Sequence, residues 1–387
     1  MILNDLPPER FEAALAAGAG ASPAEARKLF SAVHARTSRS LWRGEGPEAL
    51  AGVRGVRRPV LDAVAAQGTL PRLRQVGREA ASDGFTRYLF ECPDGARIEA
   101  VRIPIPCEAP GAEVPERLRE KPHHVVCLSS QVGCALACTF CQTGRMGFTR
   151  NLEVWEIVEQ LRLVRAEADR PVRGAVLMGM GEPMLNYDRV MAAARILSAP
   201  PGYAIAADRI TVSTAGVVPG IRRFTAERQP YRLAVSLTAA TPAKRLQVMP
   251  IEKTWPLPEL VAAVREHQAV RGGRAMLAWV AIDGFNVGEA DARELAELVG
   301  DLPIRLDLID VADPTGCFRA PAAGRLSDFR SALAALRQPV ARRYSGGREV
   351  NAGCGMLAAT PLGRSHGESR EPAGLVAAAG AVCTGPE

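Results

Sequence analysis

The sequence predicts an α/β protein, an incomplete TIM-type barrel with a small helical N-terminal domain. From residue 123 onward, short strand-like segments alternate with amphipathic helical patterns, and such alternation builds βαβ units around a parallel sheet. Before residue 80, apolar residues recur at helical spacing instead. The chain has 387 residues, of which 47% are hydrophobic. This is enough for one large domain with a smaller one, or for a barrel with extensions.

The first segment, residues 1–83, is expected to be a helical accessory domain. Residues 10–17 and 23–36 have helical spacing, and Ser22 precedes a proline as a helix N-cap does. Residues 53–58 are expected to form a basic hairpin between short helices. Residues 1–80 contain 12 Lys and Arg against 8 Asp and Glu, out of a net charge of +6 for the chain. This charge favours contact with RNA; the alternative is a solvated helical cap on the core.

A hairpin and a linker follow in residues 84–122. Residues 85–90 and 97–103 alternate as two strands around the turn Pro93-Asp94-Gly95, and a Pro- and Glu-rich stretch completes the segment. The barrel, residues 123–358, should contain strands at 125–130, 174–180, 209–214, 232–237, 274–282, 305–309 and about 340–344. Helices are expected at 154–164, 290–299 and 326–336. Residues 359–387 are predicted to be a disordered tail.

The loop after the first barrel strand holds a C-x-x-x-C-x-x-C triplet, Cys134, Cys138 and Cys141, with Cys127 upstream. Thiolates are the ligands of iron–sulfur clusters, and three ligands leave one iron of a cubane open. Structural zinc needs four ligands, usually as two C-x-x-C pairs, and no second pair lies nearby. A disulfide framework needs an oxidising compartment, and the remaining alternative is chance clustering among nine cysteines. We therefore predict that the triplet binds a cluster.

Composition limits the location and partners of the protein. The sequence has no apolar run of about 18 residues, so no membrane span is predicted, and residues 1–20 do not resemble a signal peptide. Irregularly spaced cysteines indicate a reducing cytoplasm. The pI of about 9.0 agrees with a nucleic-acid partner, although many basic proteins have none.

Four further motifs lie at strand ends or near the C-terminus: Gly179-Met180-Gly181-Glu182-Pro183, Ser213-Thr214-Ala215-Gly216, Ser236-Leu237-Thr238 and Ala352-Gly353-Cys354-Gly355-Met356-Leu357. Singly, each is also explained by a loop or a strand-end cap. In this order, and with C-x-S-S-Q-x-G-C-x-x-x-C-x-F-C before them, they resemble the RlmN/Cfr-type radical-SAM adenosine RNA methyltransferases. The resemblance covers residues 84–358.

The resemblance implies a role for each matching residue. A [4Fe-4S] cluster would be held by Cys134, Cys138 and Cys141. Cys354 would carry a methyl group, Cys127 would release the product by forming a disulfide with Cys354, and Glu99 would accept the ring proton. The residues that would contact S-adenosylmethionine (SAM) are Gly181, Glu182, Ser213, Ser236, Leu237, Thr238 and Asp313.

The resemblance also implies the reaction: methylation of adenine C2 or C8 in rRNA or tRNA, with two SAM molecules per turnover. The ring carbon is electrophilic, so ordinary transfer of a methyl cation from SAM cannot reach it. A one-electron donor such as a flavodoxin, a monomeric state and a cytoplasmic location complete the expectation. One alternative is a protein-radical activase, which would not need Cys127 and Cys354. Another is a non-catalytic iron–sulfur protein that binds RNA or senses redox state, which would not need the SAM motifs.

Three features depart from the family pattern. Thr238 stands where the family usually has histidine, and the region around Asp313 replaces an asparagine. The stretch 106–122 is longer than the usual link between the strand that carries Glu99 and the first barrel strand. These departures concern SAM contacts and the RNA target rather than the type of reaction.

Overall fold

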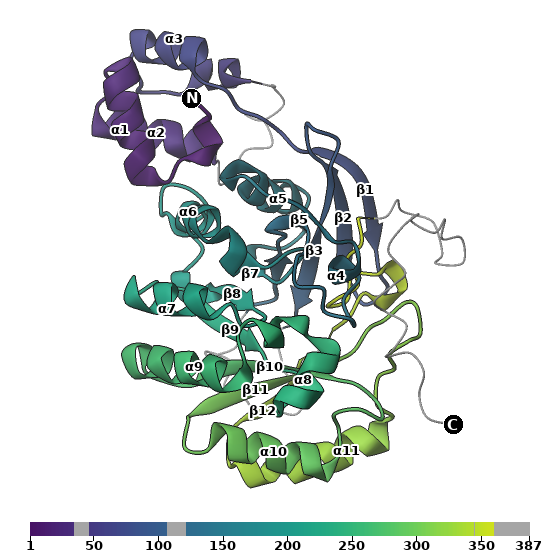
Figure 1. The fold of residues 1–387 in the computed structure, drawn as a ribbon. Helices are drawn as coiled ribbons and strands as arrows, with labels where there is room; N and C mark the ends of the chain where they lie inside the picture. Colours follow the sequence, from purple (N-terminus) through teal and green to yellow (C-terminus); the bar gives the residue numbers. More distant parts are fainter. Residues whose placement is uncertain (35–45, 107–120, 344, 360–387) are drawn as a thin grey trace.

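A computed structural model describes residues 1–34, 46–106, 121–343 and 345–359. Its centre is one ten-stranded sheet with the order β1-β2-β3-β4-β7-β8-β9-β10-β11-β12 (Figure 1). The strands from β4 onward in this order run parallel to one another. They are β4 (His123–Cys127), β7 (Val172–Leu177), β8 (Ile210–Thr214), β9 (Arg232–Ser236), β10 (Ala275–Ala281), β11 (Ile304–Asp310) and β12 (Val340–Arg343).

The predicted α/β fold class and all seven predicted barrel strands are confirmed. The predicted ends of the first two strands were too late, because Leu128 to Ser130 and Met178 to Met180 leave the strands and form loops. Figure 1 shows the connecting helices following one another along the sheet. They are α5 (Val154–Ala166), α6 (Tyr187–Ser198), α7 (Val218–Ala226), α8 (Pro242–Val248), α9 (Leu257–Arg271), α10 (Glu289–Val299) and α11 (Ala323–Ala332), which continues as a 3-10 helix, Leu333–Leu336.

The N-terminal helices gather beside α5 and α6, at the end of the molecule opposite α10 and α11 (Figure 1). They are α1 (Pro8–Ala19), α2 (Pro23–Val33) and α3 (Arg58–Gln67), with 3-10 turns at Leu3–Asp5 and Pro47–Gly52. Ser22 caps α2 as predicted, in a capping box with Glu25. Asp5 Oδ1 accepts a hydrogen bond of 2.9 Å from the Trp155 backbone nitrogen, which joins this segment to the first turn of α5. No helix of the described residues combines the length and apolarity that a membrane crossing requires.

Two predictions for the N-terminal region need correction. Residues 53–58 form a turn that leads into α3, not a hairpin. Residues 74–80 were expected to be helical but form edge strand β1 (Arg74–Ala80), antiparallel to β2. A register shift between Gln75 and Gly77 interrupts the two-residue period, so the sequence shows no clean alternation there.

The predicted hairpin is present as β2 (Thr86–Glu91) and β3 (Arg97–Ile105). Because β3 pairs antiparallel with β4, the hairpin extends the barrel sheet. The predicted linker and tail fall mostly on 107–120 and 360–387, which lie outside the described residues. The division into four segments therefore stays a prediction.

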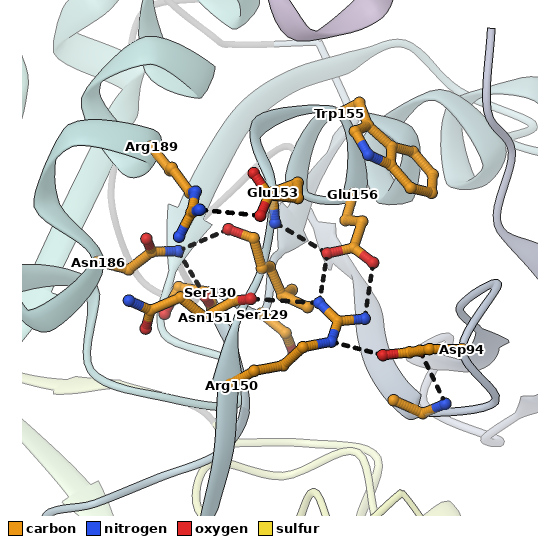
Figure 2. A network of polar contacts seen from close by, with 12 residues as sticks. Asp94, Ser129, Ser130, Arg150, Asn151, Glu153, Trp155, Glu156, Asn186 and Arg189 are labelled. Atoms are coloured by element: carbon orange, nitrogen blue, oxygen red, sulfur yellow. Dashed lines mark hydrogen bonds and ion pairs between the residues drawn. The ribbon is translucent and has the colours of Figure 1, made fainter. Parts of the chain in front are cut away.

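A second, two-stranded sheet carries the cysteine triplet. Strands β5 (Gln131–Gly133) and β6 (Phe148–Asn151) are antiparallel, and the loop between them contains the three cysteines and short helix α4 (Gln142–Arg145). Asn186 Nδ2 donates to the backbone oxygens of Ser130 and Leu152, each at 2.9 Å. These two residues flank the hairpin on either side. One buried amide therefore holds both ends of the cysteine-bearing segment together (Figure 2).

A charged network fixes the same segment from the other side (Figure 2). The Arg150 guanidinium contacts both oxygens of Glu156, at 2.7 and 2.9 Å, and Asp94 at 2.7 Å. Glu156 also accepts from the Glu153 backbone nitrogen at the start of α5. The hairpin, helix α5 and the β2–β3 turn are thus joined through one arginine.

We expect Asn186→Ala to lower the free energy of unfolding by about 2–3 kcal/mol, since the buried carbonyl groups of Ser130 and Leu152 each lose one donor, although Ser130 keeps the bond from the Leu152 backbone nitrogen. Urea denaturation measures the change. Arg189→Ala is the control on the same helix: Arg189 forms an exposed ion pair of 2.8 Å with Glu153, so its loss should cost less than about 1 kcal/mol. Equal effects of the two substitutions would contradict the role of Asn186.

Candidate active site

The three triplet cysteines lie in the loop that joins β5 to β6. Charge on Cys134 or Cys141 raises the pKa of Cys138, which shows that the three thiols lie within electrostatic reach. Burial is the largest cause of this rise, and it also raises the pKa of Cys134 to about 12. Gly144 is required here, because a Cβ atom on it would lie 2.9 Å from the Cys138 backbone nitrogen and oxygen. The loop is thus built tightly around its cysteines.

The donor set fits a cluster better than a single metal ion. Among the described residues, no three His, Cys, Asp or Glu side chains are placed to bind one ion together. A cubane differs in that each thiolate binds a different iron, so its three ligands stand farther apart. Buried thiols with raised pKa values lose their protons readily only when a metal takes their place. The residues present therefore fit a [4Fe-4S] cluster.

Asp313 supports helix α4 behind the triplet. Its carboxylate accepts hydrogen bonds from Gln142 Nε2 at 3.0 Å, Arg145 Nη2 at 3.2 Å and Thr315 Oγ1 at 2.8 Å. Burial opposes ionisation, but the bonds from Thr315 and Arg145 outweigh it and lower the pKa of Asp313. Its side chain is fully buried. The structure thus gives Asp313 a supporting contact with the cysteine loop, and its contact with SAM stays a prediction.

The predicted SAM-contacting residues lie at the carboxyl ends of adjacent strands. Gly181 and Glu182 follow β7, Ser213 is the last but one residue of β8, and Ser236 ends β9. Ser213 and Ser236 are half-buried, and their hydroxyls have no protein partner in the described part of the chain. Hydroxyls at this edge of a parallel sheet are available to a ligand.

Glu182 is held between two neighbouring loops. Its carboxylate oxygens accept from the backbone nitrogens of Met184, at 3.0 Å, and Ala215, at 2.8 Å. Burial raises the pKa of Glu182 to about 7 despite these bonds. Gly181, at φ 97°, lies so close to Gln131 that a Cβ atom would be 2.5 Å from the Gln131 Cβ. The glutamate loop is therefore packed directly against the cysteine-bearing hairpin.

Thr238 has an unusual backbone. It lies at φ 63° and is fully buried, and its hydroxyl has no partner among the described residues. A β-branched residue at positive φ is strained. Asn286 Nδ2 donates to the Thr238 backbone oxygen at 2.7 Å and holds this conformation. This strained position is the one where the resemblance leads us to expect a histidine.

Cys127 and Cys354 come together although they are far apart in the sequence. Cys127 is the last residue of β4, and the nearby Met178 backbone lowers its pKa slightly. Burial and the nearby charge of Cys354 raise the pKa of Cys127 to about 12. Cys354 is exposed, and its backbone nitrogen donates a hydrogen bond of 2.9 Å to Ser345 Oγ. Desolvation by the surrounding protein, followed by the charge of Cys141, raises the pKa of the Cys354 thiol. Both thiols are free, so the structure shows the pair without the predicted disulfide.

The Cys354 segment also contacts the cysteine loop and Glu99. The Gln142 backbone nitrogen donates to the Gly355 oxygen at 2.7 Å, and Thr143 Oγ1 donates to the Leu357 oxygen at 2.7 Å. The Ala358 backbone nitrogen donates to Glu99 Oε2 at 3.2 Å. The structure therefore gathers the triplet, the two other cysteines and the proposed proton acceptor around one C-terminal loop.

Glu99 lies fully buried on β3. Arg87 Nη1 donates to Glu99 Oε1 at 3.2 Å, and Ser129 Oγ donates to the Glu99 backbone oxygen at 2.6 Å. Burial raises the pKa of Glu99 to about 7, against the opposing charge of Arg87. A carboxyl group with this pKa can exchange a proton near neutral pH.

Sequence reasoning missed several residues that build the site. Arg87 and Ser129 hold Glu99, and Gln131 Oε1 accepts from the Glu182 backbone nitrogen at 2.8 Å. Asn186 closes the hairpin. The last two belong to motifs visible in the sequence, S-S-Q and G-E-P-x-L-N. The first of these motifs supports the resemblance through its cysteines and the second through its SAM contacts, and neither indicates by itself the structural role of Gln131 or Asn186.

Comparison with known proteins agrees with this geometry. The model of the Radical SAM superfamily matches residues 128–298. A probable RNA methyltransferase of Myxococcus xanthus is 53% identical over 94% of this chain and 96% of its own length. The dual-specificity RNA methyltransferase RlmN of Anaeromyxobacter dehalogenans is 36% identical over 92% of this chain and 91% of its own length.

A solved structure gives the same result. The crystal structure of a radical SAM methyltransferase from Sphaerobacter thermophilus matches with a TM-score of 0.80 and 35% identity. It covers 93% of this chain and 100% of that one. The resemblance inferred from the sequence motifs is confirmed: this chain belongs to the RlmN-type radical-SAM RNA methyltransferases.

Proposed function

We propose that this enzyme methylates an adenine ring carbon, C2 or C8, of rRNA or tRNA through a methyl group carried on Cys354. The observation that supports this most is the placement of Cys127 and Cys354 beside the triplet, with Glu99 against the same C-terminal loop. A radical-SAM protein activase or a non-catalytic iron–sulfur protein would need no second thiol pair there. Cys354 is exposed, as a residue that must meet an RNA base has to be.

The proposal assigns the cofactor sites residue by residue. Cys134, Cys138 and Cys141 would hold the cluster, and Glu182, Ser213, Ser236 and their motif neighbours would contact SAM. When bound, cluster and SAM supply a 5′-deoxyadenosyl radical able to take a hydrogen atom from a methyl group. Two SAM molecules per turnover, a flavodoxin-like electron donor and a monomeric enzyme belong to the same proposal.

The chain's own residues would perform the remaining steps. Cys354 forms a sulfur–carbon bond to the methyl group and later, through that carbon, to the RNA base. Glu99 removes the ring proton, and the adduct radical would pass one electron to the bound cluster, so that a closed-shell adduct remains. The Cys127 thiolate then attacks the Cys354 sulfur: the S–S bond forms, the S–C bond breaks, and the electron pair moves to the RNA carbon, which is protonated. A thiol reductant returns two electrons to the disulfide.

Cys127→Ala and Cys354→Ala should fail differently. Without Cys354 the enzyme has no methyl carrier and forms no RNA adduct. Without Cys127 the methyl group is loaded and the base is attacked, but the product stays attached to Cys354. A denaturing gel with labelled RNA should show a shifted, nuclease-sensitive band for Cys127→Ala alone. If neither variant gives the band while both are folded and carry iron, the proposed function is wrong.

Glu99 predicts a pH dependence. As a base it must be deprotonated, and because its pKa is raised to about 7, methylation should fall as pH drops below about 7. Glu99→Gln should lower methylation by about 10²–10⁴-fold and remove this acidic limb. Glu182 has a similar pKa, so 5′-deoxyadenosine release should be measured alongside. A limb that appears equally in 5′-deoxyadenosine release would assign the titration to Glu182 instead.

We also propose that the N-terminal helices contact RNA. Arg10, Arg27 and Arg54 are exposed and make no hydrogen bond or ion pair among the described residues. Arg57, in contrast, is bound to Glu25 at 2.8 Å and is unavailable. Unpaired exposed arginines can neutralise phosphates without first giving up a protein partner.

Replacing Arg10, Arg27 and Arg54 together by glutamine should weaken RNA binding. The slope of log Kd against log salt should fall by about 0.7–0.9 for each arginine that contacts a phosphate. The control replaces Arg222, Arg265 and Arg325, which each form surface ion pairs in the barrel. If the salt slope changed equally in both triple variants, the effect would come from net charge alone. A specific contact between the N-terminal segment and RNA would then be refuted.

A further inference from the structure

Arg245 contacts the loop after β8, one of the loops that form the candidate SAM site. It belongs to helix α8, which follows the Ser236-Leu237-Thr238 motif, and its side chain is fully buried. Arg245 Nη2 donates to the Ala215 backbone oxygen at 2.5 Å, and Nη1 donates to Glu252 Oε2 at 2.7 Å. The guanidinium therefore joins α8 to the Ser213-Thr214-Ala215-Gly216 motif.

The loop after β8 in turn holds Glu182. The Ala215 backbone nitrogen donates to Glu182 Oε2 at 2.8 Å, while the Ala215 oxygen accepts from Arg245. Gly216 lies so close to the guanidinium that a Cβ atom on it would be 3.1 Å from Arg245 Nη2. The bonds from Ala215 and Met184 occupy two of the roughly four lone-pair sites of the Glu182 carboxylate. Glu182 can therefore still accept from a ligand ammonium group.

The same helix also contacts the cysteine loop. Val248 is the last residue of α8, and its backbone oxygen accepts a hydrogen bond of 3.0 Å from the backbone nitrogen of Thr139, inside the cysteine triplet. Helix α8 thus supports the loop proposed to bind the cluster and, through Arg245, the loop that contacts Glu182. A ligand bound to an open iron and to a carboxylate at once requires a fixed separation between the two.

Stability alone does not account for an arginine at this position. Burial of an ion pair costs desolvation, and an apolar pair of similar volume is often at least as stable. Arg245 Nε is buried without a hydrogen-bond partner in the described part of the chain, so the guanidinium is not fully satisfied. Glu252 is 5% exposed and also accepts from the Leu257 backbone nitrogen at 2.8 Å. This held carboxylate orients the guanidinium toward Ala215.

We propose that Arg245 is a positioning residue for SAM: through Ala215 it fixes the Glu182 carboxylate where that carboxylate accepts from the SAM ammonium group. The proposal rests on the proposed function, in which Glu182 contacts SAM. Arg245 acts through Glu182 and makes no contact with SAM itself. A lysine at position 245 keeps the charge beside Glu252 but replaces a fork of two separate Nη donors by one ammonium group. We expect it to lose the bond to Ala215.

The test measures the Kd of labelled SAM by equilibrium dialysis against anaerobic, cluster-loaded protein without reductant or RNA. Glu182→Gln and Arg245→Lys should each raise this Kd about tenfold, as the loss of one hydrogen bond to a charged group does. Because Arg245 acts through Glu182, the double variant should bind SAM no more weakly than Glu182→Gln alone. Arg102→Lys is the matched control and should leave the Kd unchanged. Arg102 is also buried, but it donates to Thr86 Oγ1 at 3.2 Å and to the Glu167 oxygen at 3.3 Å.

The EPR spectrum of the reduced cluster gives a second readout, since its change on SAM addition should need about tenfold more SAM in Arg245→Lys. If this variant does not fold or bind iron, Arg245→Met/Glu252→Gln, which removes both buried charges, should give the same loss. Unchanged affinity in the arginine variant, an effect that adds to that of Glu182→Gln, or an equal loss in Arg102→Lys would overturn the proposal. Unchanged affinity in Glu182→Gln would instead refute the SAM contact assigned under the proposed function, and the proposal with it.

Discussion

The structure depends on the attachment of a cysteine-bearing hairpin to the carboxyl edge of a parallel sheet. The Asn186 amide donates to the carbonyls of Ser130 and Leu152, at the two ends of that hairpin. Both contacts are buried, so water cannot replace them. Arg150 adds a bidentate pair with Glu156 and reaches the β2–β3 turn through Asp94. A flexible loop of this length would lose considerable chain entropy when its thiols bound iron. Here the hydrogen bonds of Asn186 and Arg150 already order the loop, so less entropy is lost on binding.

The position of the hairpin explains why distant segments converge. Parallel strands end on one edge, so the residues after β4, β7, β8 and β9 lie side by side whatever their separation in sequence. The C-terminal loop then covers this edge through backbone contacts with Gln142 and Thr143. Cys354 reaches Cys127 because of that loop, and Ala358 reaches Glu99 for the same reason. The contacts of the C-terminal loop with Gln142 and Thr143 thus bring residues from distant parts of the sequence to the cysteine triplet.

The sequence could predict whatever depends on local pattern. Strand alternation located the barrel, and the spacing of Cys134, Cys138 and Cys141 located their loop. Pairing between distant residues left no local signal. The contacts of Asp313 with Arg145 and of Arg343 with Asp307 join residues whose separation no periodicity reveals. Strand β1 was missed for a different reason, since its bulge and polar edge position remove the alternation.

Carboxyl groups with raised pKa values and a residue with a strained backbone both lie near the candidate site. Burial raises the pKa of both Glu99 and Glu182 to about 7, so two carboxyl groups near the site can change charge around neutral pH. Thr238 adds a strained backbone at φ 63° with a buried, unpartnered hydroxyl, among the described residues, and Asn286 maintains it. Asn286 can hold Thr238 in this strained conformation because Asn286 is itself buried and also donates a hydrogen bond of 2.7 Å to the Val280 backbone oxygen. Asn286, rather than the threonine hydroxyl, therefore sets the backbone conformation at position 238.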